Sequence, residues 1–156
     1  MKKKIKRALI SVSDKSKLSG ILPTLKKFKI EILSSGGTFK YIRKCGFPCI
    51  EISDYTNFQE ILDGRVKTLH PKIHSGILFK RNNKKHIKQM KLQKFKNIDL
   101  VIVNFYPFEK TVLKTKDENK IVEDIDIGGP ALARSAAKNF KHVTVLISNN
   151  QFESLI

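Results

Sequence analysis

The 156-residue sequence contains no tryptophan and only two cysteines. Cys45 and Cys49 are separated by three residues and have no second pair, so they form neither a disulfide framework nor a zinc-ligand set. His70 and His74 are four residues apart, but Pro71 lies between them and is expected to break the helix that a His-x3-His metal site requires. We therefore predict packed cysteines, hydrogen-bonded structural histidines and no metal.

Long apolar runs are also missing. No run approaches the roughly 20 residues that span a bilayer. The basic residues 1–7 are followed by strand-like sequence, without the long apolar segment and small-residue cleavage site of a signal peptide. The sequence predicts a cytoplasmic protein with no membrane partner.

Acidic residues are scarce, with 14 against 31 basic residues and a net charge of +17. Such an excess can indicate a nucleic-acid partner, because clustered cations release counterions from phosphates. Here the lysines are spread from end to end, and neither an aromatic stacking row nor a binding motif accompanies them. We predict solvated lysine-rich faces and no specific nucleic-acid partner, with weak polyanion binding left open.

The composition that is present, 40% hydrophobic and 29% charged, is typical of one globular domain, here residues 1–156. Apolar patterning predicts strands at 7–13, 30–33, 48–52, 99–105 and 142–147. It predicts helices at 18–28, 39–45, 58–62, 82–95, 121–125 and 130–139. This alternation favours a doubly wound α/β fold, with a mostly parallel sheet and helices on both faces.

Polar segments follow the strands or open the helices. They are SVSDK (11–15), SSGGT (34–38), RVKTLHP (65–71), NFYPF (104–108) and DIGGP (126–130). Ligands of parallel sheets bind outside the carboxyl ends of the strands, so these segments predict one pocket. The Gly36-Gly37 pair before a helix suits a phosphate, although a simple tight turn is an alternative. Arg65, Lys67 and Thr68 add cations and a hydroxyl for an anion.

Acid–base chemistry has three candidates. Asp126 precedes the predicted helix 130–139 and Lys138 lies two to three turns into it, so the two can form a carboxylate–amine pair, while Tyr106 offers a hydroxyl. A helix-start carboxylate, a surface lysine and a packed aromatic are the alternative interpretations of these three residues.

In their order, the motifs SVSDK, SGGT, GRVKTLHPKIHSGIL, NFYPF, IDIGGP and AAKN resemble the N-terminal region of the bifunctional AICAR transformylase/IMP cyclohydrolase family. The resemblance extends from about residue 8 to 148 and implies a fold similar to methylglyoxal synthase. It implies that formyl-AICAR ribotide closes to IMP with loss of water, without a cofactor, in a homodimer. Formyl-tetrahydrofolate would belong to a transformylase domain, which this chain lacks, and we expect the chain to be truncated at its C-terminus.

The resemblance also implies roles for individual residues. Lys138 would donate and accept the proton, Asp126 would lie against it, and Lys67 and Tyr106 would line the reacting base. The implied substrate-binding residues are Ser11, Ser13, Asp14, Lys15, Ser35, Gly36, Gly37, Thr38, Arg65, Thr68, Asn104 and Ile127. Three alternatives remain open: methylglyoxal synthase activity, a nucleotide-binding regulatory module and an inactive fragment.

Overall fold

A computed structural model describes residues 4–155. The core of the domain is a five-stranded sheet whose neighbouring strands all run parallel. The strands are β1 (Arg7–Val12), β2 (Glu31–Ser34), β3 (Ile50–Glu51), β4 (Leu100–Asn104) and β5 (Thr144–Leu146). Their spatial order is β3-β2-β1-β4-β5. The chain therefore winds outward in both directions from β1, which places a topological switch point between β1 and β4.

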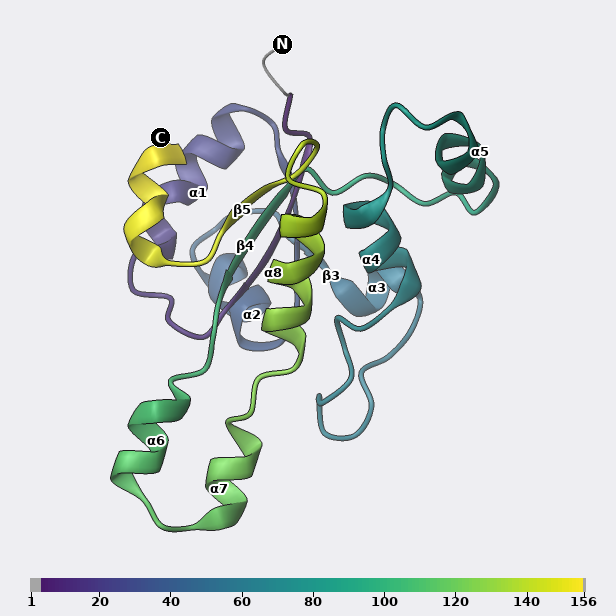
Figure 1. The fold of residues 1–156 in the computed structure, drawn as a ribbon. Coiled ribbons are helices and arrows are strands. Elements are labelled where there is room, and N and C mark those ends of the chain that lie inside the picture. The colour runs from purple at the N-terminus through teal and green to yellow at the C-terminus, as the bar shows by residue number, and fades with distance from the viewer. Residues whose placement is uncertain (1–3, 156) are drawn as a thin grey trace.

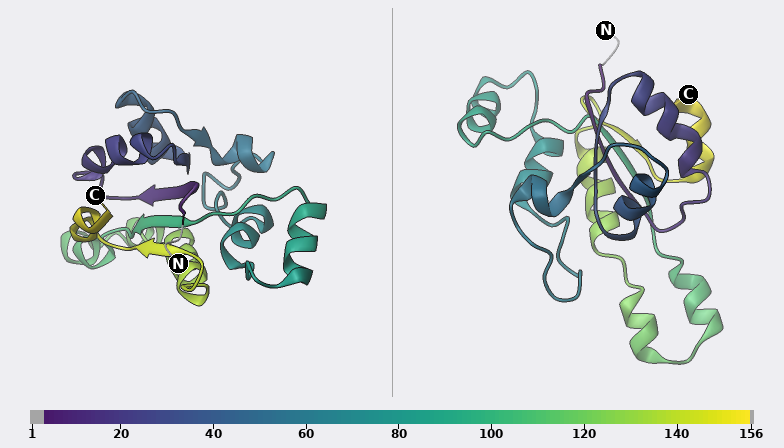
Figure 2. Two further views of the ribbon diagram at one scale, coloured as in Figure 1. Left: turned by 90° about the horizontal axis from the view of Figure 1, so that it is seen from above. Right: turned by 180° about the vertical axis from the view of Figure 1, so that it is seen from behind.

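Helices cover both faces of this sheet (Figures 1 and 2). The first face carries α1 (Leu18–Lys27), α2 (Gly36–Lys44) and the 3₁₀ helix η1 (Asn149–Leu155). The second carries α3 (Ile52–Thr56), α4 (Pro71–Leu78) and α8 (Gly128–Lys138). The predicted doubly wound α/β class is confirmed.

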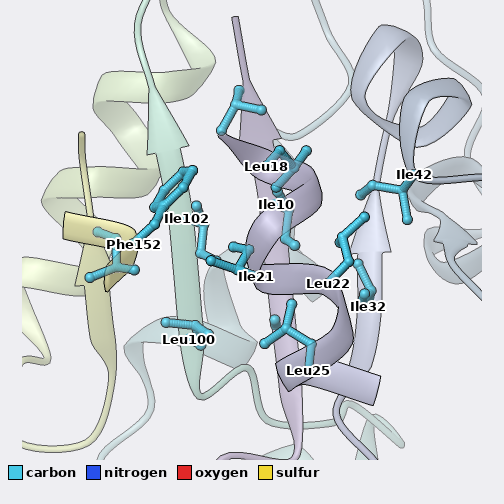
Figure 3. Close-up of a cluster of buried hydrophobic side chains, with 13 residues drawn as sticks. Ile10, Leu18, Ile21, Leu22, Leu25, Ile32, Ile42, Leu100, Ile102 and Phe152 are labelled. Atoms are coloured by element: carbon cyan, nitrogen blue, oxygen red, sulfur yellow. The ribbon is translucent and has the colours of Figure 1, made fainter. Parts of the chain in front are cut away.

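Side chains that alternate in direction along β1 and β4 explain the two core layers, one on each face of the sheet. Ile10 and Ile102 face the first layer, where they pack with Leu22 of α1 (Figure 3). Leu9 and Val101, one residue earlier on each strand, face the second layer. All of these side chains are essentially inaccessible to solvent, and each contributes about 1.5–3 kcal/mol by leaving water.

A buried carboxylate ties β1 to β4 at the amino ends of the strands. Asp99 accepts hydrogen bonds from the backbone N–H groups of Lys6 at 2.8 Å and Arg7 at 3.1 Å. It also accepts a bond from the Asn97 side chain at 2.7 Å and pairs with Arg81. Burial alone would raise the pKa of Asp99, but these hydrogen bonds and the Arg81 charge lower it overall.

The helix predicted at 58–62 is wrong. Ile61 instead forms an isolated antiparallel bridge with Val66, and Leu62 and Asp63 have positive φ angles of 54° and 53°. The helix in this part of the chain is α3, which ends before this segment. Apolar spacing over five residues did not separate a short helix from a tight turn.

The expected break at Pro71 is also wrong, because Pro71 is the first residue of α4. Proline suits this position, since the first helical N–H has no partner and the φ angle is already helical. His70 caps the helix by accepting the Lys72 N–H through Nδ1 at 3.1 Å. His74 lies 2.9 Å from the Ser135 hydroxyl, which fits the predicted structural role. Among residues 4–155 no group of histidines, cysteines and carboxylates could hold a metal ion.

Three helices stand off from the sheet. The helix α5 (Lys84–Leu92) agrees with the lysine-rich helix predicted at 82–95. The helices α6 (Phe108–Lys114) and α7 (Glu118–Glu123) form an arm that projects from the body (Figures 1 and 2) and contains no buried residue. The sequence predicted only a helix at 121–125 there. No helix in the described part of the chain is long and apolar enough to cross a membrane.

The two cysteines are free and pack against the first core layer, as predicted. Burial raises the pKa of the Cys49 thiol to about 12. The thiol of Cys49 is therefore protonated at neutral pH and a weak nucleophile.

Candidate functional site

A cavity of about 550 Å³ lies beyond the carboxyl ends of β1, β2 and β4. This volume is within the range of small-molecule sites, about 300–1,000 Å³. The five polar segments predicted from sequence all contribute to it. Its lining residues include Ser11, Ser13, Lys15, Ser35, Gly37, Thr38, Arg65, Lys67, Thr68, Asn104, Tyr106, Asp126, Ile127, Gly128 and Gly129.

The first turn of α2 is flanked by two ammonium groups. A Cβ atom added to Gly37 would lie 3.8 Å from Lys15 Nζ, and one added to Gly36 would lie 3.6 Å from Lys67 Nζ. Gly36 also has a positive φ angle of 53°, which other residues adopt only with strain. Ser35 occupies the N-cap without a capping hydrogen bond from its side chain. The partial positive charge of the helix start and the two cations together form an anion-binding corner.

The start of α8 forms the wall of the cavity opposite this corner. Its backbone approaches Thr68 and Asp126 so closely that glycine is needed at two positions. A Cβ atom at Gly128 would lie 2.8 Å from Thr68 Oγ1, and one at Gly129 would lie 2.6 Å from Asp126 Oδ2. Asp126 Oδ1 accepts the Gly129 N–H at 2.8 Å, so the carboxylate sits at the helix start, as the alternative interpretation of Asp126 expected. Within residues 4–155, its second oxygen accepts no hydrogen bond and remains available to a ligand.

Tyr106 shares this wall with Asp126. The side chain is 46% exposed and lines the cavity. Partial burial raises the pKa of Tyr106, and the charges of Asp126 and Asp124 raise it further. The hydroxyl therefore stays protonated at neutral pH, as a proton donor beside a carboxylate.

Two acidic residues pair with the cations of the cavity. Arg65 forms an ion pair with Glu123 at the end of α7. Lys67 Nζ lies 3.8 Å from Glu60 Oε2, a weaker contact. An anionic ligand that binds Arg65 would therefore have to replace Glu123, and one that binds Lys67 would have to replace Glu60.

Asn104 holds the loop between β1 and α1. Its Oδ1 accepts the backbone N–H groups of Ser13 at 2.6 Å and Asp14 at 2.9 Å. Its Nδ2 donates to the Asp14 carbonyl at 2.8 Å and to Asn149 Oδ1 at 2.9 Å. These four bonds engage both ends of the Asn104 side-chain amide, so Asn104 holds the loop in place while also lining the cavity. The Asp14 side chain is exposed outside the cavity and accepts the Ser16 N–H at 2.9 Å.

Thr38 likewise uses its hydroxyl inside the protein. The side chain is 5% exposed. Its Oγ1 donates to the Val12 carbonyl at 2.9 Å and accepts the Val12 N–H at 3.2 Å. The hydroxyl therefore fixes α2 against β1, and only the backbone of Thr38 remains for a ligand.

The cavity architecture agrees with the comparison to known families. Residues 18–131 match the MGS-like domain. The chain belongs to the MGS-like domain family. A crystal structure of ForH superposes with a TM-score of 0.84 at 30% identity, covering 96% of this chain and 76% of that one.

Curated relatives of this MGS-like domain carry the name bifunctional purine biosynthesis protein PurH. The protein from Elusimicrobium minutum is 48% identical over 99% of this chain. The protein from Neisseria meningitidis serogroup C is 51% identical over 97% of this chain. The chain spans about 30% of the length of these relatives, 30% and 29% respectively. The resemblance inferred from the motifs is thus confirmed.

Three predicted site residues, Lys138, Asp14 and Gly36, do not line the cavity, and Lys138 lies at the far end of α8 from it. This lysine is the last residue of the 11-residue helix α8, whose first residues line the cavity. At 1.5 Å per residue the two ends of α8 are about 15 Å apart. Asn139, the next residue, is anchored to the Ile77 and Phe79 carbonyls at 2.6 and 3.0 Å. Within one chain, Lys138 and Asp126 therefore do not form the pair that the resemblance implies.

The cavity also contains residues that sequence reasoning missed. They are Asp63, Val122 and Glu123. Asp63 immediately precedes the motif GRVKTLHPKIHSGIL, so extending that motif by one residue would have found it. Val122 and Glu123 of α7 carried no signal, because their position depends on the arm folding back beside the cavity.

Proposed function

We propose that this MGS-like domain acts in purine biosynthesis as an IMP cyclohydrolase, closing formyl-AICAR ribotide to IMP with release of water. One observation carries the proposal: a single cavity contains both an anion-binding corner at Lys15 and Lys67 and a proton-transfer wall at Tyr106 and Asp126. The substrate needs both, since it is a phosphate ester whose ring closure moves protons. The relatives named PurH support the pathway.

Each wall has a role in the reaction. The phosphate occupies the α2 corner, and the base lies against α8. The carboxamide nitrogen bonds to the formyl carbon, and the Lys67 ammonium stabilises the resulting oxyanion. Asp126 Oδ2 accepts the proton of the attacking nitrogen, and the Tyr106 hydroxyl protonates the departing oxygen. The formyl oxygen leaves as water with two protons, one from Tyr106 and the one that Asp126 took from the attacking nitrogen, and the proton lost by the formylamino nitrogen returns to Tyr106. The step requires no cofactor.

The test is conversion of formyl-AICAR ribotide to IMP, followed by ultraviolet absorbance against the slow uncatalysed closure. We expect protein-dependent IMP formation that falls about 10²-fold or more in Tyr106→Phe and Asp126→Asn. Val112→Ala on the exposed arm is a matched surface control and should retain the rate. Wild-type protein that binds IMP without accelerating closure would contradict the proposed activity.

A second candidate, nucleotide binding without turnover, is favoured by the distance between Lys138 and the cavity. The same assay separates the two, because a binding module has affinity for IMP and no rate. The homodimer implied by the resemblance belongs to the first proposal and predicts twice the monomer mass in sedimentation. We expect that dimer to persist at the protein concentration of the assay.

A further inference from the structure

Asn149, at the start of η1, is hydrogen-bonded to the loop between β1 and α1 although it lies outside the cavity lining. Its Nδ2 donates to Asp14 Oδ2 at 2.8 Å and to Ser16 Oγ at 3.2 Å. Its Oδ1 accepts from Asn104 Nδ2 at 2.9 Å. The Asn149 amide therefore joins the loop between β1 and α1 to Asn104 at the end of β4, and we call this set of contacts the loop junction.

This junction controls where two cavity residues sit. Asn104 fixes the backbone N–H groups of Ser13 and Asp14, and Lys15 Nζ donates to the Ser13 carbonyl at 3.1 Å. Ser13 and Lys15 line the anion-binding side of the cavity. A rotation of the Asn104 amide would disturb both residues. Three bonds to the loop backbone hold this amide, and within residues 4–155 Asn149 is the one side chain that adds a fourth.

The partner of Asn149 is a charged group. Hydrogen bonds from the backbone and side chain of Ser16 lower the pKa of Asp14, and the charges of Lys110 and Lys15 lower it slightly further. The carboxylate is therefore ionised at neutral pH, and a hydrogen bond to an ionised acceptor is stronger than one between neutral groups.

We propose that Asn149 is a positioning residue for the anion-binding loop, so that η1 forms part of the functional site without touching the ligand. The proposal rests on the proposed function only for the identity of the ligand, a nucleoside monophosphate. The contacts that hold the loop are independent of it.

Two substitutions at Asn149 test this, and the same two at Asn150 control for them. Asn150 is exposed, and within residues 4–155 its side chain makes no hydrogen bond. Asn149→Ala removes the bridge from the Asp14 carboxylate and the Ser16 hydroxyl to the Asn104 amide, and leaves the direct bonds of Asn104 to the Asp14 backbone. Asn149→Asp keeps the shape but places a second carboxylate against Asp14, which repels it unless one of the two is protonated.

The first measurement is the affinity for IMP by calorimetry at pH 7.5 and pH 5, each relative to wild type at the same pH. We expect both Asn149 variants to bind about tenfold more weakly at pH 7.5, the effect of losing a hydrogen bond to a charged group. At pH 5 the Asp14 carboxylate is still ionised, because its pKa lies below its ordinary value of 3.8, so we expect both Asn149 variants to remain weaker than wild type there too. Asn150→Ala and Asn150→Asp remain within about twofold of wild type. Equal affinities in the Asn149 and Asn150 variants would overturn the proposal.

The second measurement needs no ligand. Amide hydrogen exchange at Ser13 and Asp14 should accelerate in Asn149→Ala and remain at the wild-type rate in Asn150→Ala. Unchanged exchange in Asn149→Ala would show that Asn104 holds the loop alone. If wild-type protein failed to bind IMP, the proposed function would fail, and this exchange experiment would still decide the role of Asn149.

Discussion

Arg65 and Glu123 form an ion pair across the cavity, joining the loop before α4 to the end of α7. The hydrogen bond to Glu123 and its charge raise the pKa of Arg65, so the guanidinium is always charged. The two side chains are 62% and 59% exposed, which makes the pair easy to exchange for another partner. A phosphate that contacts Arg65 must compete with this carboxylate.

Glu123→Gln should therefore increase the affinity for IMP. Removing the competing charge is expected to strengthen binding about two- to fivefold, the range for an exposed pair. Glu118→Gln, the same change on the exposed surface of α7, corrects for the added net positive charge. Calorimetric titration at low and high salt measures both, and equal affinities in the two variants would show that Glu123 does not compete.

Gly129→Ala should disturb the start of α8. The new Cβ atom would lie 2.6 Å from Asp126 Oδ2 and 3.0 Å from Phe105 Cδ1, so one of them must move. We expect a loss of about 1–3 kcal/mol in the free energy of unfolding and a large loss of turnover.

Gly20→Ala is the matched control for that change, because Gly20 is exposed in α1 and nothing lies within 4 Å of its Cβ position. This variant should be more stable than wild type by about 0.5–1 kcal/mol. Urea unfolding measures both variants. Equal stability of the two would mean that the α8 start relaxes without strain.

Asp99→Asn should destabilise the protein in a pH-dependent way. The pKa of Asp99 in the folded chain lies below its ordinary value of 3.8, so its contribution to stability is complete above pH 3.8 and is lost as the pH falls through the folded-state pKa. At pH 7 we expect a loss of about 3 kcal/mol, because Arg81 loses its buried partner.

The difference between Asp99→Asn and wild type should then shrink as the pH is lowered below 3.8. Asp54→Asn, which changes an exposed carboxylate, should differ from wild type by less than about 0.5 kcal/mol at each pH. Urea titrations across the acid range provide the comparison. A constant difference between Asp99→Asn and wild type would place the Asp99 effect in packing and not in charge.

Lys138→Ala should leave the affinity for IMP within about twofold of wild type, because Lys138 is exposed and a helix length away from the cavity. Turnover decides its role. Loss of turnover at unchanged affinity would mean that Lys138 reaches the reacting atoms of another copy of the chain, as the role implied by the resemblance requires. Retained turnover would assign proton transfer to Tyr106 and Asp126.

Sequence reasoning succeeded where one physical signal dominated. Apolar runs such as 100–103 are buried on both faces, which is typical of central parallel strands, and the polar segments that follow such strands lie at one edge of the sheet. Both follow from patterns within a few neighbouring residues. The fold class and the location of the cavity were therefore predictable.

The errors arose where distant contacts decide. The sequence alone did not show whether Pro71 begins a helix or interrupts one. The hydrogen bond from the Lys72 N–H to the His70 side chain marks it as the first residue of α4. Asn104 lines the cavity, and its predicted contact with the substrate stays a prediction; the sequence did not show that its amide is held by the loop beside it. The helix α6 has no buried residue and so no amphipathic pattern to detect.

The pairing of Ala8 with Leu100 has a consequence for the nascent chain. During synthesis at about 5–20 residues per second, β1 emerges roughly 5–20 seconds before β4. It can pair with β2 in that interval, but its other edge remains open, with the apolar side chains of a strand that is buried in the finished protein except at Ser11. Open apolar edges recruit other chains. Translation speed between β1 and β4 therefore sets how long each new molecule is exposed to aggregation.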